Sequence, residues 1–149
     1  MMSNQNLTPE QARDLRALAG IIIPPSAAYG VPGADDELII SDIVRSLERD
    51  HDDACQALVQ LAALAGGAFA DLGPARRAEV ASTFRESGGA PLAALVRVVL
   101  LCYYRDDRVM RSLGFEPRSP FPKGHVVEQG DWSLLDPVRA RPRMYRPVE

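Results

Sequence analysis

Apolar residues return at intervals of three and four along most of the chain, which is the spacing of a helix that buries one face. Between these stretches stand prolines, glycines and aspartates, the residues that begin and end helices. The pattern predicts an all-α fold, a small helical bundle. The predicted helices lie between residues 9 and 24, 36 and 49, 52 and 65, 74 and 88, 91 and 104, and 107 and 114.

Capping residues mark several of these helix ends. Thr8 is placed to be the N-cap of the first helix, with Pro9 at the first helical position and Gln11 able to close a capping box. Asp35 or Asp36 is expected to cap the second helix. Paired glycines follow the third and the fourth, where they allow the left-handed backbone of a helix end.

The stretch PLAALVRVVLLCYY, residues 91–104, is the element on which the others are predicted to pack, and Arg97 is its only charge. Its valines would also fit a buried strand, but the strong helix formers at its start favour a helix. It is shorter than the roughly 20 residues of a membrane span, so other helices are expected to surround it, with no direct membrane span. We therefore predict that Leu95, Val99 and Leu100 are buried.

Helical spacing ends at Gly114, and residues 115–149 hold half of the 12 prolines. Large apolar residues occur among these prolines, whereas disordered linkers usually lack them. We therefore expect this segment to be ordered by packing against a surface outside itself. The prediction is one domain with a helical body, residues 1–114, and an irregular Pro/Arg-rich arm, residues 115–149, that wraps a partner protein. The side chains predicted to bind this partner are Phe121, Trp132, Leu134, Leu135, Arg139, Arg141, Arg143, Tyr145 and Arg146.

Composition and charge narrow the class of partner. With 149 residues, the chain is long enough to bury one core. Its net charge of −3 argues against non-specific electrostatic binding of nucleic acid, and the arginines of the arm have no wider basic face around them. The first residues, MMSNQNLTPEQ, contain neither a basic nor an apolar segment, so we expect no export signal and a cytoplasmic protein.

Few residues offer the chemistry of catalysis. Cys55 and Cys102 lie in apolar helical runs with no CxxC spacing and no histidine expected beside them, so they are interpreted as buried free thiols. His51 lies among aspartates at a helix junction, where capping and solvation are favoured over a metal site, and His125 is interpreted as a loop residue. No phosphate loop, GxSxG elbow or zinc spacing is found. We therefore predict no catalytic, cofactor-binding or metal-binding residue in this chain.

The junction YYRDDR, residues 103–108, is the densest cluster of polar and aromatic side chains. One interpretation is a ligand pocket lined by Tyr103 and Tyr104. The favoured interpretation is structural: the rings pack together and an aspartate caps a short helix. A small ligand-binding protein that uses the two tyrosines stays an alternative, as does a stand-alone helical adaptor.

Three segments in order, LRALAGIIIPP (residues 15–25), GVPGADD (30–36) and YYRDDRVMRSLGF (103–115), resemble the gluconate 2-dehydrogenase subunit 3 family. The resemblance implies a non-catalytic helical subunit bound to a large flavoprotein of the glucose–methanol–choline oxidoreductase type. That partner would hold the FAD and oxidise a sugar or a related alcohol. Family members assist folding and often export of the large subunit. Because no export signal is expected in the present sequence, it is expected to depart from the family pattern in this respect, and the resemblance leaves stabilisation of the catalytic subunit as the expected role.

Overall fold

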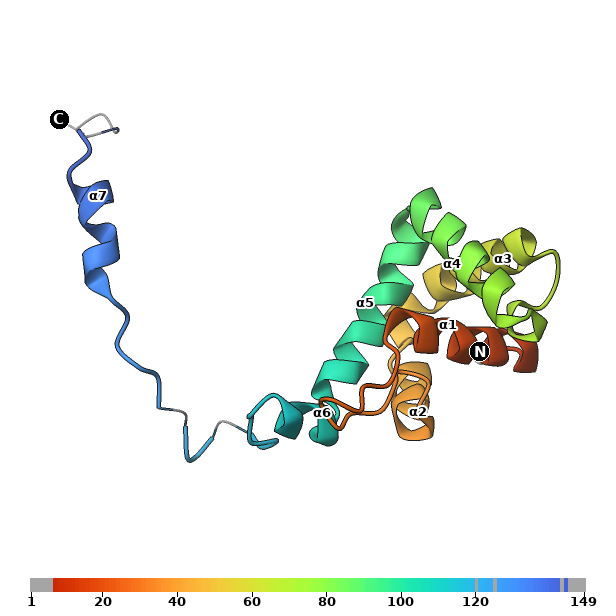
Figure 1. Cartoon of the computed structure of the whole chain (residues 1–149), viewed down its shortest axis with the longest axis horizontal. Coiled ribbons are helices and arrows are strands. Elements are labelled where there is room, and N and C mark those ends of the chain that lie inside the picture. The colour runs from red at the N-terminus through yellow and green to blue at the C-terminus, as the bar shows by residue number, and fades with distance from the viewer. Residues whose placement is uncertain (1–6, 120, 125, 143, 145–149) are drawn as a thin grey trace. The chain divides into compact units, whose positions relative to one another are not determined.

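A computed structural model describes residues 7–119, 121–124, 126–142 and 144. This part of the chain is all-α, as predicted, apart from one isolated β-bridge between Ser26 and Val31. The chain divides into two compact units, Met1–Pro117, hereafter the body, and Arg118–Glu149, hereafter the arm (Figure 1). The predicted boundary was residue 114.

The body consists of helices joined by short turns. Helix α2 is shorter than predicted, because the N–H of Ser46 closes its last turn on the carbonyls of Asp42, Ile43 and Val44. The helices of the body are α1 (Pro9–Ile22), α2 (Glu37–Arg45), α3 (His51–Ala65), α4 (Pro74–Ser87), α5 (Ala90–Arg105) and α6 (Asp107–Ser112), with 3-10 turns at Glu48–Asp50 and Phe69–Asp71.

The predicted caps are present. The N–H of Gln11 donates to Thr8 Oγ1 at 3.2 Å and the N–H of Thr8 donates to Gln11 Oε1 at 2.9 Å, which closes the capping box of α1. Asp36 caps α2 and Asp106 caps α6, each accepting from the backbone N–H two residues later. Each of these bonds satisfies a donor that has no partner inside its helix.

The core is formed where α3 packs on α1, α4 and α5. Its largest buried side chains come from elements far apart in the chain: Leu15 of α1, Ile43 of α2, Leu61 of α3, Phe84 of α4 and Leu95 of α5. Burial of each such side chain contributes roughly 1.5–3 kcal/mol to folding. The body therefore has a core of its own.

Helix α5 is buried on one side only. Leu95 and Val99 are fully buried as predicted, whereas Leu100 is 37% exposed, so the prediction for Leu100 is wrong. Leu101 and Tyr104 on the same side of the helix are 56% and 54% exposed. Helices α2 and α3 pack on the buried side, and no described element of the body covers the other side along its full length. An apolar helix face is thus left open to solvent.

The arm contains a helical segment that the sequence did not predict. A 3-10 turn, Trp132–Leu135, leads directly into α7, Asp136–Arg139. Asp131 caps the segment, because its Oδ1 accepts from the N–H of Ser133 at 3.0 Å. Pro137 lies in the first turn of α7, where its missing N–H is not needed. The prediction of an irregular arm is wrong for this segment.

In the part of the chain that the structure describes, no single helix is both long and apolar enough to cross a membrane; α4 and α5 meet the length and composition criteria only as a pair bent by 117°.

Candidate protein-binding surfaces

The apolar residues of the arm are exposed. Trp132 is 59% exposed and Leu134 is 74% exposed, and the side chains of Phe121 and Leu135 also face solvent. From residue 121 onward, no described side chain of the arm is buried. Uncovered apolar side chains of this size are typical of a surface that binds another protein.

The predicted arginines of the arm fall into two groups. The Nη1 atom of Arg139 pairs with Asp136 Oδ1 at 3.2 Å within α7, and both side chains are well exposed. Arg141 is exposed. An exposed pair of this kind contributes little to stability, so Arg139 is available to exchange its carboxylate for one on a partner. The other predicted residues, Arg143, Tyr145 and Arg146, lie outside the described residues.

The helical segment gives the arm a more definite binding face than the sequence indicated. Leu134 and Val138 are four residues apart, so they lie on the same side of the segment. The sequence-based prediction also missed Val126, Val127 and Val138, which are exposed. Their signal was present in the sequence, because adjacent valines and a Leu-x-x-x-Val spacing mark apolar surface in a segment without a core.

The tyrosines at the end of α5 are used by the fold. The rings of Tyr103 and Tyr104 meet edge to face, with their centroids 5.2 Å apart. Tyr103 is buried and its hydroxyl donates to the carbonyl oxygen of Pro32 at 3.1 Å. Burial also raises the pKa of Tyr103. These contacts support the structural interpretation of the cluster over a ligand pocket.

Arg108 holds the loop before α2 against the start of α6. Its Nη2 atom lies 2.7 Å from Asp36 Oδ1 and 2.9 Å from Asp106 Oδ2. Hydrogen bonds from Arg108 lower the pKa of both carboxyl groups, despite an opposing effect of burial, and the two carboxylates together raise the pKa of the guanidinium. The two aspartates also cap α2 and α6, so one arginine ties two helix starts together.

A second arginine joins α5 to α2. Arg105 donates to both oxygens of Asp42, at 2.6 and 2.7 Å, and also to the hydroxyl of Ser46. The hydrogen bonds from Arg105 lower the pKa of Asp42. Forked pairs of this geometry orient helices as well as attract charge. Arg105, Asp106 and Arg108 of the YYRDDR segment therefore help to hold the helices of the body together.

The surroundings of Cys55 differ from the prediction of a buried thiol with no histidine beside it. Cys102 is a buried free thiol as expected, and burial raises its pKa. Cys55 is a free thiol but only half-buried, and its Sγ lies 3.7 Å from His51 Nε2. The two residues are one helical turn apart, which brings them together. Within the described residues, no group of three or more histidine, cysteine, aspartate or glutamate side chains is arranged to hold a metal ion.

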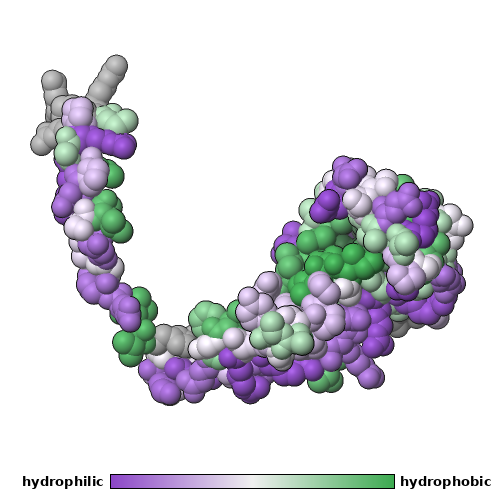
Figure 2. Space-filling view, viewed as in Figure 1, coloured by the Kyte–Doolittle hydropathy of each residue, from purple (hydrophilic) through white to green (hydrophobic). Residues whose placement is uncertain are grey.

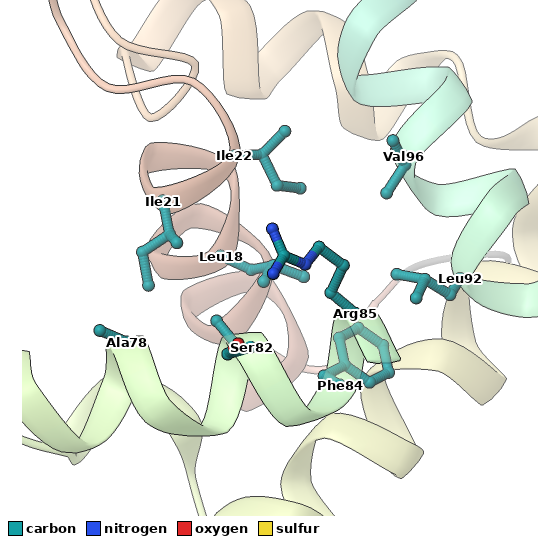
Figure 3. Close-up of a pocket in the computed structure, with 10 residues that line it drawn as sticks. Leu18, Ile21, Ile22, Ala78, Ser82, Phe84, Arg85, Leu92 and Val96 are labelled. Atoms are coloured by element: carbon teal, nitrogen blue, oxygen red, sulfur yellow. The ribbon is translucent and has the colours of Figure 1, made fainter. Parts of the chain in front are cut away.

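The body also carries an apolar groove of about 420 Å³ between α1, α4 and α5. Figure 2 shows apolar surface gathered beside α5 in this region of the body. The close-up shows Arg85 extending from α4 into the groove (Figure 3). Periodicity alone did not reveal the groove, since its residues belong to three helices. Its apolar walls include Leu18, Ile21, Ile22, Ala78, Leu92 and Val96.

No protein-family model, curated protein or solved structure matches this chain. The arrangement of the described residues therefore has to indicate what the chain does. It offers two surfaces suited to binding protein: the exposed apolar residues of the arm, and the groove with the open side of α5 on the body.

Proposed function

We propose that this chain is a non-catalytic helical subunit that binds and stabilises a larger protein through its arm. The observation that carries the proposal is the exposure of Trp132, Leu134 and Leu135 on a capped helical segment. Large apolar residues at such positions cost solubility unless a partner covers them. Tryptophan and arginine are also the residues that most often dominate the energy of protein interfaces.

The resemblance to the gluconate 2-dehydrogenase subunit 3 family supplies the class of the partner. In this proposal the partner is a large FAD-dependent oxidoreductase of the glucose–methanol–choline type, which oxidises a sugar or another alcohol. The partner holds the FAD and supplies the catalytic groups. The present chain holds no cofactor and acts by keeping the large subunit folded, so its loss lowers activity through instability.

Co-expression with the neighbouring reading frame tests the proposal. A tag on this chain is expected to recover a large second chain with the absorption spectrum of bound flavin. In the complex the arm should resist protease, whereas in the isolated chain it should be cut. Recovery of the tagged chain alone, with no flavoprotein from any co-expressed candidate, would contradict the proposal. A colourless complex with another protein would favour the helical adaptor instead.

A truncation before residue 130 assigns the contact to the arm. The shortened chain lacks the helical segment but keeps every helix of the body, so its circular dichroism should stay close to that of the full chain. It should no longer recover the flavoprotein. Undiminished recovery by a folded truncation would exclude the arm as the main contact. Loss of most helicity would show that the arm completes the core of the body.

A further inference from the structure

The groove on the body has a charged group at an otherwise apolar site. Arg85 lines it from α4, opposite Ile22 of α1 and Leu92 of α5 (Figure 3). The structure gives Arg85 no hydrogen bond or ion pair with any other described residue, and the side chain is exposed. Most other arginines of the body, such as Arg105 and Arg108, are paired with carboxylates. The groove therefore presents one unpaired positive charge beside apolar walls.

The apolar surface extends beyond the groove along α5. Leu92 and Val96 line the groove, and Leu100 and Tyr104 follow them at the same spacing of four residues. Residues four apart lie one above the other on a helix, so these four side chains form one continuous ridge. At 1.5 Å per residue the ridge is about 18 Å long. Leu100 and Tyr104 are among the exposed side chains of α5 that the sequence-based prediction of a surrounded helix did not anticipate.

The length of the ridge decides between two kinds of occupant. A small molecule with an apolar body and a carboxylate would fit the groove and Arg85, but it would leave Leu100 and Tyr104 exposed. Ligand pockets usually bury most of the surface of their ligand, whereas this groove is continuous with an open helix face. An amphipathic helix laid along the ridge would cover both parts. Its apolar residues at positions i, i+4, i+7 and i+11 would meet the groove and the ridge.

We propose that this surface binds an amphipathic helix of a partner protein, with an acidic side chain of that helix paired to Arg85. The net charge of the chain is −3, so overall electrostatics disfavour an acidic ligand. A preference for an acidic helix would therefore have to come from the local charge of Arg85. This docking site is additional to the arm, and its test uses no flavoprotein, so this inference and the proposed function fail separately.

The test measures binding of two synthetic helices to the full chain by fluorescence anisotropy. Both peptides are about 18 residues long and carry leucines at positions i, i+4, i+7 and i+11, so that the apolar face is about as long as the ridge. One has glutamates on both flanks of its apolar face and the other has lysines there. The glutamate peptide is expected to bind about tenfold more tightly at low salt, and added salt should narrow the difference. Equal binding, or no binding of either peptide, would overturn the proposal.

Charge variants assign the preference to one arginine. Arg85→Glu is expected to reverse the preference, so that the lysine peptide binds more tightly. The matched control is Arg76→Glu, which makes the same change of charge on α4, where Arg76 pairs with Glu79 outside the groove. The control should keep the preference for glutamate. The same change of preference in both variants would show a general charge effect and contradict a specific role for Arg85.

A steric variant tests the groove without disturbing the core. Ala78 is an exposed residue of α4 that lines the groove, so Ala78→Trp should fill the groove while the body stays folded. Binding of the glutamate peptide is expected to weaken by about tenfold or more. Ala75→Trp, one turn earlier on the same helix and not part of the groove, serves as the control. Unchanged binding by the folded Ala78→Trp variant would place the peptide elsewhere.

Two further measurements exclude other occupants. If dodecanoate displaces the glutamate peptide and binds more tightly than it, the groove is a site for apolar carboxylates and the helix proposal is wrong. If the chain self-associates in sedimentation, and Ala78→Trp abolishes this, a second copy is the occupant. Neither result is expected, because the ridge is longer than a small ligand and the unpaired guanidinium of Arg85 favours an acidic side chain on a partner helix.

Discussion

The body and the arm place the same kinds of residue in opposite environments. In the body, leucine and phenylalanine side chains such as Leu95 and Phe84 are buried between helices, and most arginines pair with carboxylates. In the arm, Trp132 and Leu134 are exposed although their segment is helical and capped. Regular secondary structure is therefore no sign that a segment has a core. Helix α5 shows the same contrast within one element, since Leu95 faces the core and Leu101 faces solvent.

The largest effect is expected where α5 is buried. Leu95 is fully buried, so Leu95→Ala should lower the free energy of unfolding by about 2–5 kcal/mol, through lost apolar contacts and the cavity that remains. Leu101→Ala, on the open side of the same helix, should change it by less than about 1 kcal/mol. Urea unfolding followed by circular dichroism measures both. Equal effects at the two positions would mean that the two sides of α5 do not differ as the structure shows.

A buried aspartate provides the next largest effect. Asp14 of α1 is 2% exposed, and its Oδ1 accepts from the N–H of Ala70 at 2.8 Å. Asp14→Ala leaves that N–H without a partner, so we expect a loss of about 1–3 kcal/mol of stability. Asp14→Asn keeps an acceptor oxygen and should lose less. Glu10→Ala, an exposed change on the same helix, is the control, and a loss as large as that of Asp14→Ala would argue against the bond.

The Arg108 contacts predict a dependence on pH. Hydrogen bonds from Arg108 lower the pKa of Asp36 and Asp106 in the folded protein. Their contribution is therefore complete above the unfolded pKa of about 3.9, and it is lost as the pH falls through the lower folded pKa. Arg108→Leu should cost about 1 kcal/mol at neutral pH, because the guanidinium is partly exposed.

Thermal melts at neutral and acidic pH test this prediction. The wild-type chain should lose more stability than Arg108→Leu when the pH is lowered from neutral to below about 3.9. Arg111→Leu is the matched control, because Arg111 pairs with Asp107 on the surface of α6 and both side chains are largely exposed. That variant should follow the wild-type pH profile. Parallel profiles for wild type and Arg108→Leu would show that other groups determine the acid sensitivity.

Local signals in the sequence predicted most of the helix ends. The capping box at Thr8, the cap at Asp36 and the paired glycines act within a few residues, so they can be recognised without knowing the fold. Asp14 could not be assigned in this way, since its partner Ala70 is 56 residues away. It lies among polar residues of the first helix, and only the packing of α1 on the Phe69–Asp71 turn shows that it is buried.

The exposed side of α5 was harder to predict because the residues on both sides are apolar. Arg97 was the one available signal: it is exposed, and Leu101 and Tyr104 lie four and seven residues later on the same side. The groove could not be predicted from the sequence alone, because α1, α4 and α5 each contribute part of it and are brought together only by the fold. The helical segment of the arm did have a local signal, in the Asp131 cap and in Pro137 within the first turn of α7.

The smallest effect on stability, and the sharpest separation of the two units, is expected at Trp132. Its side chain is 59% exposed and lies in the arm, so Trp132→Ala should change the unfolding of the body by less than about 0.5 kcal/mol. Binding to the flavoprotein should nevertheless weaken by about tenfold or more, because a tryptophan that becomes buried at an interface loses a large apolar contact when truncated. Glu128→Ala, an exposed change outside the helical segment and its apolar residues, should affect neither quantity by a comparable amount. Melting temperature and partner affinity measured on the same preparations test both statements.

A fall in melting temperature as large as that of Leu95→Ala would mean that Trp132 belongs to the core of the body. A stable variant with full affinity would mean that the interface lies elsewhere, with the groove and ridge of the body as the next surface to test.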